Sequence, residues 1–286
     1  MSLDIGAAVT EGVRRLRSRD GLVLVGAFLV VGVLSSVATQ SLTVGISEAL
    51  LEFAQSPDAP AGTDVEAFRE QLRQTRAGSP LAVDISAGAA FGLAFLLGLL
   101  AEALRIVAVR VFYAPAGDRP TDLRRNLAFA TANGFLGGIV VSVLVLLGLV
   151  FLIVPGVFLA LVLFFVRQEI AVEDRNFVDA MAESWALTRG NRLNLLGLVF
   201  VLLVVGFVAF LPTIAASVAG SSTASVVVGA VISPVVTVFG IAATTRAYAQ
   251  LKAEAGREGP TGPDETDESD ESETVGALGP DDIPEP

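Results

Sequence analysis

The chain has 286 residues, and its 30 acidic side chains against 19 basic ones give a formal net charge of −11. The composition excludes an ordinary soluble acidic domain, because 53% of the residues are hydrophobic, only 17% are charged and the mean hydropathy is +0.68. A globular domain is typically about 25% charged. The imbalance is local: residues 254–286 hold 12 acidic side chains and one arginine, and the preceding 253 residues hold 18 of each sign. The composition predicts a membrane protein with a separate acidic C-terminal segment.

The residue types that carry most enzyme chemistry are missing from the sequence. There is no histidine and no cysteine, which excludes a Ser-His-Asp hydrolase, a thiol nucleophile, a disulfide and a Cys/His metal site. The only lysine, Lys252, follows Leu251, so the Gly-Lys-Ser/Thr of a phosphate-binding loop is absent, and no two glycines have the Gly-x-Gly spacing of a dinucleotide site. We therefore expect no catalytic residue, no cofactor and no metal.

Stretches without a charged residue predict the membrane spans, because crossing about 30 Å of hydrocarbon takes roughly 20 apolar helical residues. The first stretch, 21–47, has 27 residues. A cleaved signal peptide is the alternative, because four arginines precede this stretch and Ser36-Val37-Ala38 resembles a cleavage site. A signal core is only about 7–15 residues long, so we favour a retained span.

The later stretches are 85–101, 126–166 and 193–245. Asp84 and Glu102 bracket the first of these, which predicts that both carboxylates lie at the membrane interfaces. The 41 residues of 126–166 are too long for one span, and Pro155-Gly156 supplies a break. The small polar residues 220–225 divide the last stretch. The predicted fold is an all-α polytopic membrane bundle with six transmembrane helices, at about 21–43, 83–104, 130–154, 156–172, 193–217 and 224–247.

The distribution of basic residues predicts the sidedness of these spans. With six spans and a cytoplasmic N-terminus, 16 of the 19 basic residues lie inside, and only Arg69, Arg73 and Arg76 lie outside. If Pro155-Gly156 only kinked a single span, the count would become 9 inside and 10 outside. The positive-inside rule therefore favours a hairpin at Pro155-Gly156 and a cell-membrane protein with both termini in the cytoplasm.

Three segments outside the spans have helical patterns. The outer loop 48–80 contains Thr63-Asp-Val-Glu66, the form of a capping box, followed by a short helix through Arg76. We interpret it as a surface helix, with a ligand-binding lid as the alternative. Residues 177–189, with Asn176 as a cap and Gly190 as a stop, predict an amphipathic interfacial helix, for which partner docking is the alternative. The N-terminal segment 1–20 is a third amphipathic element, and residues 254–286 predict a disordered cytoplasmic tail.

One ionisable cluster is predicted at the inner mouth of the bundle. Glu102 and Arg105 are three residues apart on one helix, and Arg110 follows. The cluster fits a contact with a lipid headgroup or a substrate. The plainer interpretation is an ion pair at a helix end whose long side chains reach the interface.

The stretch from Pro155 to Leu195 resembles a known family. Pro155-Gly156 is followed by Ser184-Trp185-Ala-Leu-Thr-Arg189-Gly190-Asn191, a pattern similar to that of the membrane domain attached to some glycerophosphodiester phosphodiesterases and of uncharacterised multi-pass proteins of halophilic archaea. The arginine-rich, acidic composition also suits a halophilic archaeon. The resemblance implies an anchor-like six-helix module in which the motif residues form an interfacial turn. It does not imply phosphodiesterase activity, because that chemistry belongs to a separate domain with catalytic histidines.

Our main prediction is a non-enzymatic membrane module that organises lipids or a partner. The alternative is a transporter of a small or lipid-like substrate, suggested by the prolines at 155, 212 and 234. A membrane enzyme that uses carboxylates and arginine is a third hypothesis. The expected partners are membrane lipids and an unidentified protein, and no nucleic acid is expected.

Overall fold

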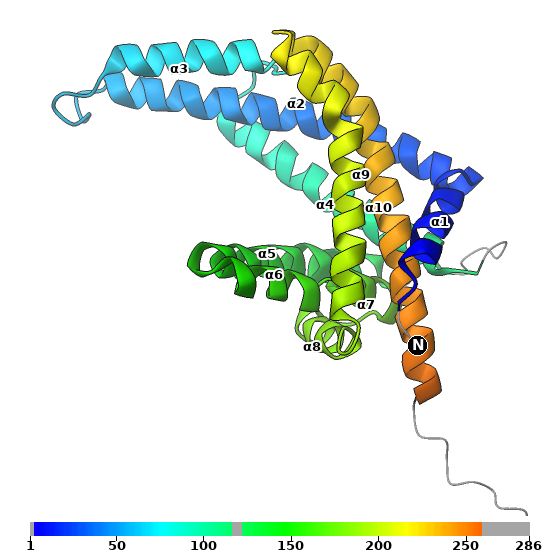
Figure 1. Cartoon of the computed structure of the whole chain (residues 1–286). Helices are drawn as coiled ribbons and strands as arrows, with labels where there is room; N and C mark the ends of the chain where they lie inside the picture. Colours follow the sequence, from blue (N-terminus) through cyan, green and yellow to red (C-terminus); the bar gives the residue numbers. More distant parts are fainter. Residues whose placement is uncertain (1–2, 116–121, 259–286) are drawn as a thin grey trace, which may run out of the picture.

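The computed structural model describes residues 3–115 and 122–258 (Figure 1). All regular secondary structure in the described residues is helical, which confirms the all-α prediction, and six helices are long and apolar enough to cross a membrane. The helices in chain order are α1 (Ile5–Leu16), α2 (Arg19–Gln55), α3 (Val65–Gly78), α4 (Ala87–Tyr113), α5 (Leu127–Phe151), α6 (Ile153–Val162), α7 (Val166–Glu173), α8 (Phe177–Leu187), α9 (Arg192–Val218) and α10 (Ser222–Glu258). Helices α6 and α7 together make the fourth candidate span, Ile153–Glu173.

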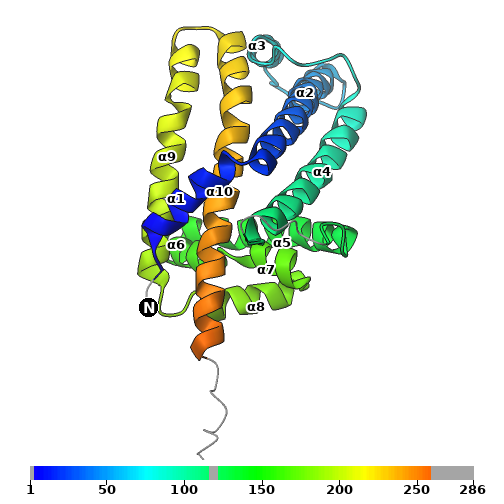
Figure 2. The same ribbon diagram turned by 90° about the vertical axis from the view of Figure 1, so that its right-hand side faces the viewer.

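Helices α9 and α10 run side by side (Figures 1 and 2). Helix α2 packs on α4 and α10, and α1 lies across α10. We call the part of the molecule near α8 the α8 end, and the opposite part, where α9 turns into α10, the turn end. The hairpin of α5 and α6 lies at the α8 end and runs across the direction of α9 and α10 (Figures 1 and 2).

The predicted break near Pro155-Gly156 is present as a tight hairpin. Only Leu152, with an extended backbone, separates α5 from α6. Pro155 lies in the first turn of α6, where the missing N–H removes no helical hydrogen bond. The two helices touch at Gly148 and Gly156, because a Cβ on Gly148 would lie 2.7 Å from the Gly156 Cα. The small residues set how closely α5 and α6 approach.

The second turn of the bundle, between α9 and α10, is polar. Gly220 has a φ of +78°, which a residue without a Cβ adopts without strain. Its N–H donates to the Ser217 carbonyl, and the Ser221 N–H donates to the Ala216 carbonyl. This pair of bonds is the Schellman pattern that ends a helix, and the turn is built from the glycine and serines that divided the last predicted stretch.

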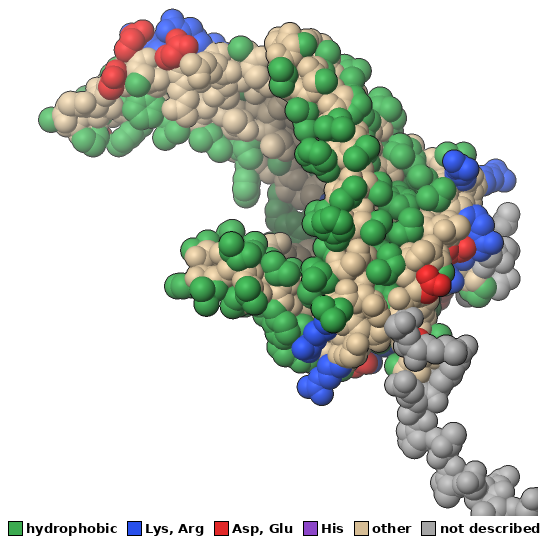
Figure 3. Space-filling model, viewed as in Figure 1, with side chains coloured by type: hydrophobic (Ala, Val, Ile, Leu, Met, Phe, Trp, Pro, Cys, Tyr) green, Lys and Arg blue, Asp and Glu red, His purple; other side chains and the backbone are tan. Residues whose placement is uncertain are grey.

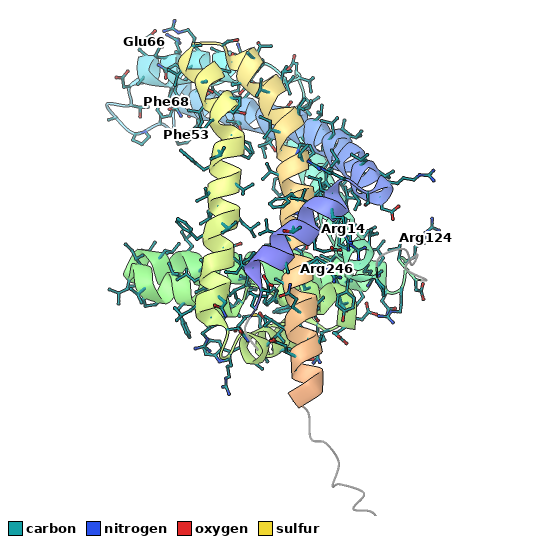
Figure 4. All side chains as sticks on the ribbon, turned by 45° about the vertical axis from the view of Figure 1, so that its right-hand side comes forward. Arg14, Phe53, Glu66, Phe68, Arg124 and Arg246 are labelled. Atoms are coloured by element: carbon teal, nitrogen blue, oxygen red, sulfur yellow. The ribbon has the colours of Figure 1, made fainter. Side chains whose placement is uncertain are left out.

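Helix α3 forms where the sequence predicts it, but its cap differs from the prediction. Asp64 is the capping residue, because its carboxylate accepts hydrogen bonds from the backbone N–H groups of Glu66 and Ala67. The Thr63 hydroxyl donates to the Pro60 carbonyl instead, so the capping box is not formed. Helix α3 runs along the outer part of α2, and its Phe68 lies near Phe53 of α2 (Figure 4).

The first helix packs on the bundle along a face of small residues. Ala8 and Gly12 are buried, and a Cβ on Gly12 would lie 3.0 Å from the Ala243 Cβ of α10. Asp4 caps the helix by accepting a hydrogen bond from the Ala7 N–H. The predicted amphipathic helix is therefore present, and its inner face contacts protein.

The predicted start of the disordered tail at residue 254 is wrong, because α10 continues to Glu258. Tyr248 and Leu251, near this end of α10, are buried in an apolar cluster with Leu3, Phe165 and Leu195. This packing keeps the end of α10 helical beyond the apolar stretch. The remainder of the predicted tail, 259–286, lies outside the described residues.

Candidate functional site

Glu102 of α4 forms an ion cluster in the apolar part of the fold. Its side chain is only 4% exposed, and its carboxylate accepts hydrogen bonds from Arg105 of the same helix at 3.2 Å and from Arg167 of α7 at 2.7 Å. A second Arg167 N–H reaches the other carboxylate oxygen at 3.3 Å. Helix α5 leaves room for the carboxylate at Gly134, where a Cβ would lie 2.8 Å from Glu102 Oε1. The cluster of two guanidiniums and one carboxylate carries one net positive charge.

The position of Glu102 differs from the prediction that it marks a helix end. Helix α4 continues to Tyr113, so Glu102 lies inside the helix and the predicted span 83–104 stops too early. The run without charges ends at Glu102, but the two arginines neutralise the carboxylate and allow the apolar packing of α4 to continue. Ile106, Val109 and Phe112, beyond it, are fully or almost fully buried.

Arg110, which the sequence grouped with Glu102 and Arg105, belongs to a different site. Its Nε donates to the Ala171 carbonyl at 2.7 Å, and its Nη2 donates to Asp174 Oδ1 at 2.7 Å. Its Nη1 donates to the carbonyls of Leu123 and Arg125 at 3.0 and 2.6 Å. Arg110 therefore joins the segment before α5 to the end of α7, and its role is structural.

The two partners of Glu102 face different cavities. Arg167 lines a cavity of about 500 Å³ between α5, α6 and α7, and most of the other lining residues run along α5 from Gly134 to Leu149. Arg105 lines a second cavity, of about 420 Å³, between α2, α4, α9 and α10. The side chains of Arg105 and Arg167 are 40% and 39% exposed. In the space-filling view the surface is hollowed between the arm of α2 and α3 and the arm of α5 and α6, with mainly hydrophobic borders (Figure 3).

A second ion cluster at the α8 end was not predicted from the sequence. Glu169 of α7 is fully buried, and its two oxygens contact Lys252 Nζ of α10 at 3.0 Å and Arg175 Nε at 3.4 Å. Lys252 and Arg175 also approach Glu183 of α8, at 3.8 and 3.6 Å. The only lysine of the chain thus connects α7, α8 and α10.

The motif that carries the family resemblance joins α6, α7 and α8. Ser184 is fully buried; its hydroxyl donates to the Val162 carbonyl at 2.8 Å and accepts from the Phe165 N–H at 3.1 Å. These two backbone groups lie where the helical hydrogen bonding between α6 and α7 is interrupted. Trp185 packs edge to face on Phe158, with ring centroids 5.4 Å apart.

The rest of the motif forms the turn into α9. Gly190 has a φ of +80°, and the Asn191 side-chain oxygen accepts a hydrogen bond from the Leu3 N–H. Arg189 is exposed, and its N–H donates to the Ala186 carbonyl. The predicted cap of α8 is present, because the Asn176 side chain accepts from the N–H groups of Val178 and Asp179. Helix α8 ends at Leu187, two residues before the predicted end.

Within the described ranges, no three carboxylates are arranged to hold a metal ion. The features that the structure presents are Arg167 facing an apolar cavity, Arg105 facing a cavity with several polar side chains, and a buried carboxylate with two cationic partners. Such groups can bind an anion next to an apolar chain. They offer no activated nucleophile.

The fold and its six apolar helices define a multi-pass integral membrane protein. Over residues 3–251 the sequence matches a family described as a domain of unknown function, DUF7847, and the chain belongs to this family. No curated protein and no solved structure matches the chain. The family match covers helices α1 to α9 and most of α10, including the Glu102 cluster and the motif from Pro155 to Asn191, and it ends one residue before Lys252 of the second ion cluster.

Proposed function

We propose that the protein is a non-enzymatic membrane module that organises lipids by retaining an anionic lipid beside Arg167. The observation that carries the proposal is the position of this guanidinium, at one end of an apolar cavity. A guanidinium has five N–H donors, and Arg167 uses two of them for Glu102. The remaining donors match the oxygens of a phosphate group, for which arginine is well suited.

The cavity beside Arg167 suits a hydrocarbon chain. Its lining runs along one face of α5 from Gly134 to Leu149, which is about 22 Å at 1.5 Å per residue. Ser142 is the only hydroxyl group in this lining, and Arg167 is the only charge. A ligand with one negative head and one apolar chain therefore matches the cavity better than a water-soluble ion does.

The supporting experiment measures lipid retention by the purified full-length protein. Native mass spectrometry in mild detergent, with equal amounts of phosphatidylglycerol and phosphatidylcholine, is expected to give preferential adducts with the anionic lipid. Arg167→Gln should remove this preference. Arg76→Gln is the matched control, because Arg76 also pairs with one glutamate, Glu48, but lies far away at the turn end. Equal retention of both lipids by the wild-type protein would contradict the proposal.

We further propose that both termini face the cytoplasm of a cell membrane. The support is the arginine distribution, with only the three arginines of α3 on the opposite side. A protease site added after Pro286 should be cut only after the cells are permeabilised. Cleavage in intact cells would show that the C-terminus faces the outside and would contradict the proposed orientation.

A transporter is the second candidate, and the cavity beside Arg105 favours it. This cavity lies between four long helices, its lining includes the side chains of Gln40, Ser233 and Thr237, and it reaches Pro234 inside α10. Proteoliposomes loaded with a panel of small organic anions would test it. Flux that Arg105→Ala abolishes and Arg76→Ala preserves would support transport, and no flux for any compound would count against it.

A further inference from the structure

The hairpin of α5 and α6 is apolar on all sides. From Gly134 to Val166, Ser142 is the only polar side chain. Large hydrophobic side chains on several faces of α5 are exposed, among them Leu136, Ile139 and Leu147. A helix at a membrane surface has one polar face, whereas one that is hydrophobic all round belongs in a core or in lipid. Helix α5 packs on α4, α6 and α7, and its remaining faces are exposed and apolar, as suits contact with lipid.

The tip of the hairpin is also apolar, unlike the other turns between long helices. The side chains of Val150, Phe151, Leu152, Ile153 and Val154 are between 67% and 80% exposed. In contrast, α9 and α10 are joined through Gly220 and Ser221, and the segment between α2 and α3 includes two aspartates. A tip in water would expose five adjacent large hydrophobic side chains, which soluble surfaces avoid.

The backbone of the tip suits a position in hydrocarbon, where unpaired backbone groups cost several kcal/mol each. The Leu152 N–H donates to the Gly148 carbonyl at 3.0 Å, and the Gly156 N–H donates to the Leu152 carbonyl at 3.3 Å. Pro155 has no N–H to satisfy. A one-residue connection with these bonds leaves fewer free donors than an ordinary loop.

Both ends of the hairpin are fixed on one side of the molecule. The Arg110 guanidinium binds Leu123 and Arg125 before α5, and Asp174 after α7. The Asn133 side chain of α5 also accepts a hydrogen bond from the Phe177 N–H at the start of α8. The hairpin extends from this base across the direction of α9 and α10 (Figures 1 and 2). Its axis therefore does not follow α9 and α10, although α2 also runs across them (Figure 1).

From these observations we propose that the α5–α6 hairpin is re-entrant. It enters the leaflet on the α8 side, turns at Leu152 inside the hydrocarbon and returns to the same side, so its tip binds the acyl chains of that leaflet. The proposal is independent of lipid retention at Arg167. It also leaves the count of basic residues on each side unchanged, because a re-entrant hairpin and two full crossings both return the chain to its starting side.

The absence of cysteine from the sequence makes a direct test possible. Single cysteines are introduced as Phe151→Cys at the tip, Ser221→Cys in the turn between α9 and α10, and Arg124→Cys at the α8 side, where Arg124 lies at the periphery (Figure 4). Intact and permeabilised cells are treated with a membrane-impermeant maleimide. Ser221→Cys and Arg124→Cys should be labelled from opposite sides, and Phe151→Cys from neither side until the membrane is dissolved in SDS.

A second measurement turns the absence of labelling into a positive result. A nitroxide attached to the Phe151→Cys variant in proteoliposomes should collide readily with oxygen, which dissolves in hydrocarbon, and poorly with a water-soluble nickel chelate. The nitroxide on Ser221→Cys should show the opposite preference. Labelling of Phe151→Cys from the same side as Ser221→Cys would show a full crossing, and labelling from the side of Arg124→Cys would show a surface hairpin. Either result overturns the proposal.

Discussion

The buried ion pair between Glu169 and Lys252 leads to a quantitative prediction. Lys252→Met removes the closer of the two cations that contact a fully buried carboxylate, at 3.0 Å, and leaves Arg175 at 3.4 Å. Breaking a buried pair by removing one partner costs about 3–5 kcal/mol, because the remaining charge is left without compensation. Since Arg175 remains, we expect a loss of about 3 kcal/mol, at the lower end of that range.

A double substitution separates charge compensation from simple packing. Replacing both members of a buried pair with apolar residues of similar size is often neutral. The variant Glu169→Leu/Lys252→Met should therefore recover much of the stability that Lys252→Met loses. Lys252→Arg keeps the positive charge and serves as the control.

The assay is thermal unfolding of the full-length protein in detergent, followed by size-exclusion chromatography after heating. A loss of about 3 kcal/mol corresponds to a melting temperature lower by on the order of 5–10 °C. If the double variant is as unstable as Lys252→Met alone, the buried charge is not the cause. If Lys252→Met melts like the wild type, the contact between Lys252 and Glu169 does not contribute to the stability of the fold.

Three further predictions concern the hairpin, the α6–α7 junction and the N-terminal helix. Gly156→Ala should reduce stability by about 1–3 kcal/mol, because a Cβ would lie 2.5 Å from the Leu149 amide nitrogen, and unchanged melting would contradict the close contact. Ser184→Ala should cost about 1–3 kcal/mol, since the buried hydroxyl makes two backbone hydrogen bonds; Ser184→Thr, if it fits, should lose less. The hydrogen bond from Arg14 holds the pKa of Glu11 below its usual 4.5, so the carboxylate stabilises the fold above that pH and its contribution disappears as the pH falls through the lowered pKa. At pH 7 the Glu11→Gln variant should therefore be less stable than the wild type by up to about 1 kcal/mol and should melt at a lower temperature. In acid the two melting temperatures should become equal.

The sequence predicts the helical membrane fold well, because charges are rare and each apolar run is long. The break near Pro155 and the polar turn at Gly220 also follow from local chemistry, since proline and glycine restrict or permit particular backbone conformations. The Asn176 cap is local too. In each case the deciding interaction lies within a few residues along the chain.

The ion clusters were less predictable because their partners are distant in sequence. Arg167 lies 65 positions from Glu102, and the sequence offers only the weak signal that both residues stand at the same ends of successive apolar runs. For Glu169 and Lys252 we find no local signal. The prediction for Arg110 was wrong for the same reason. Its position on α4 suggested that it joins the Glu102 cluster, but its side chain points toward the end of α7.

Helix α10 combines a long charge-free part with a charged end that contacts other helices. Its 24 charge-free residues from Ser222 to Thr245 rise about 36 Å, whereas the hydrocarbon layer is about 30 Å thick. A hydrophobic stretch that is longer than the hydrocarbon layer can respond to a thinner or thicker bilayer by changing its tilt. Because Lys252 lies near one end and contacts α7 and α8 through glutamates, a change of tilt would swing that end against both helices. A change in bilayer thickness would thus alter the contacts of the buried Glu169 cluster through the tilt of α10.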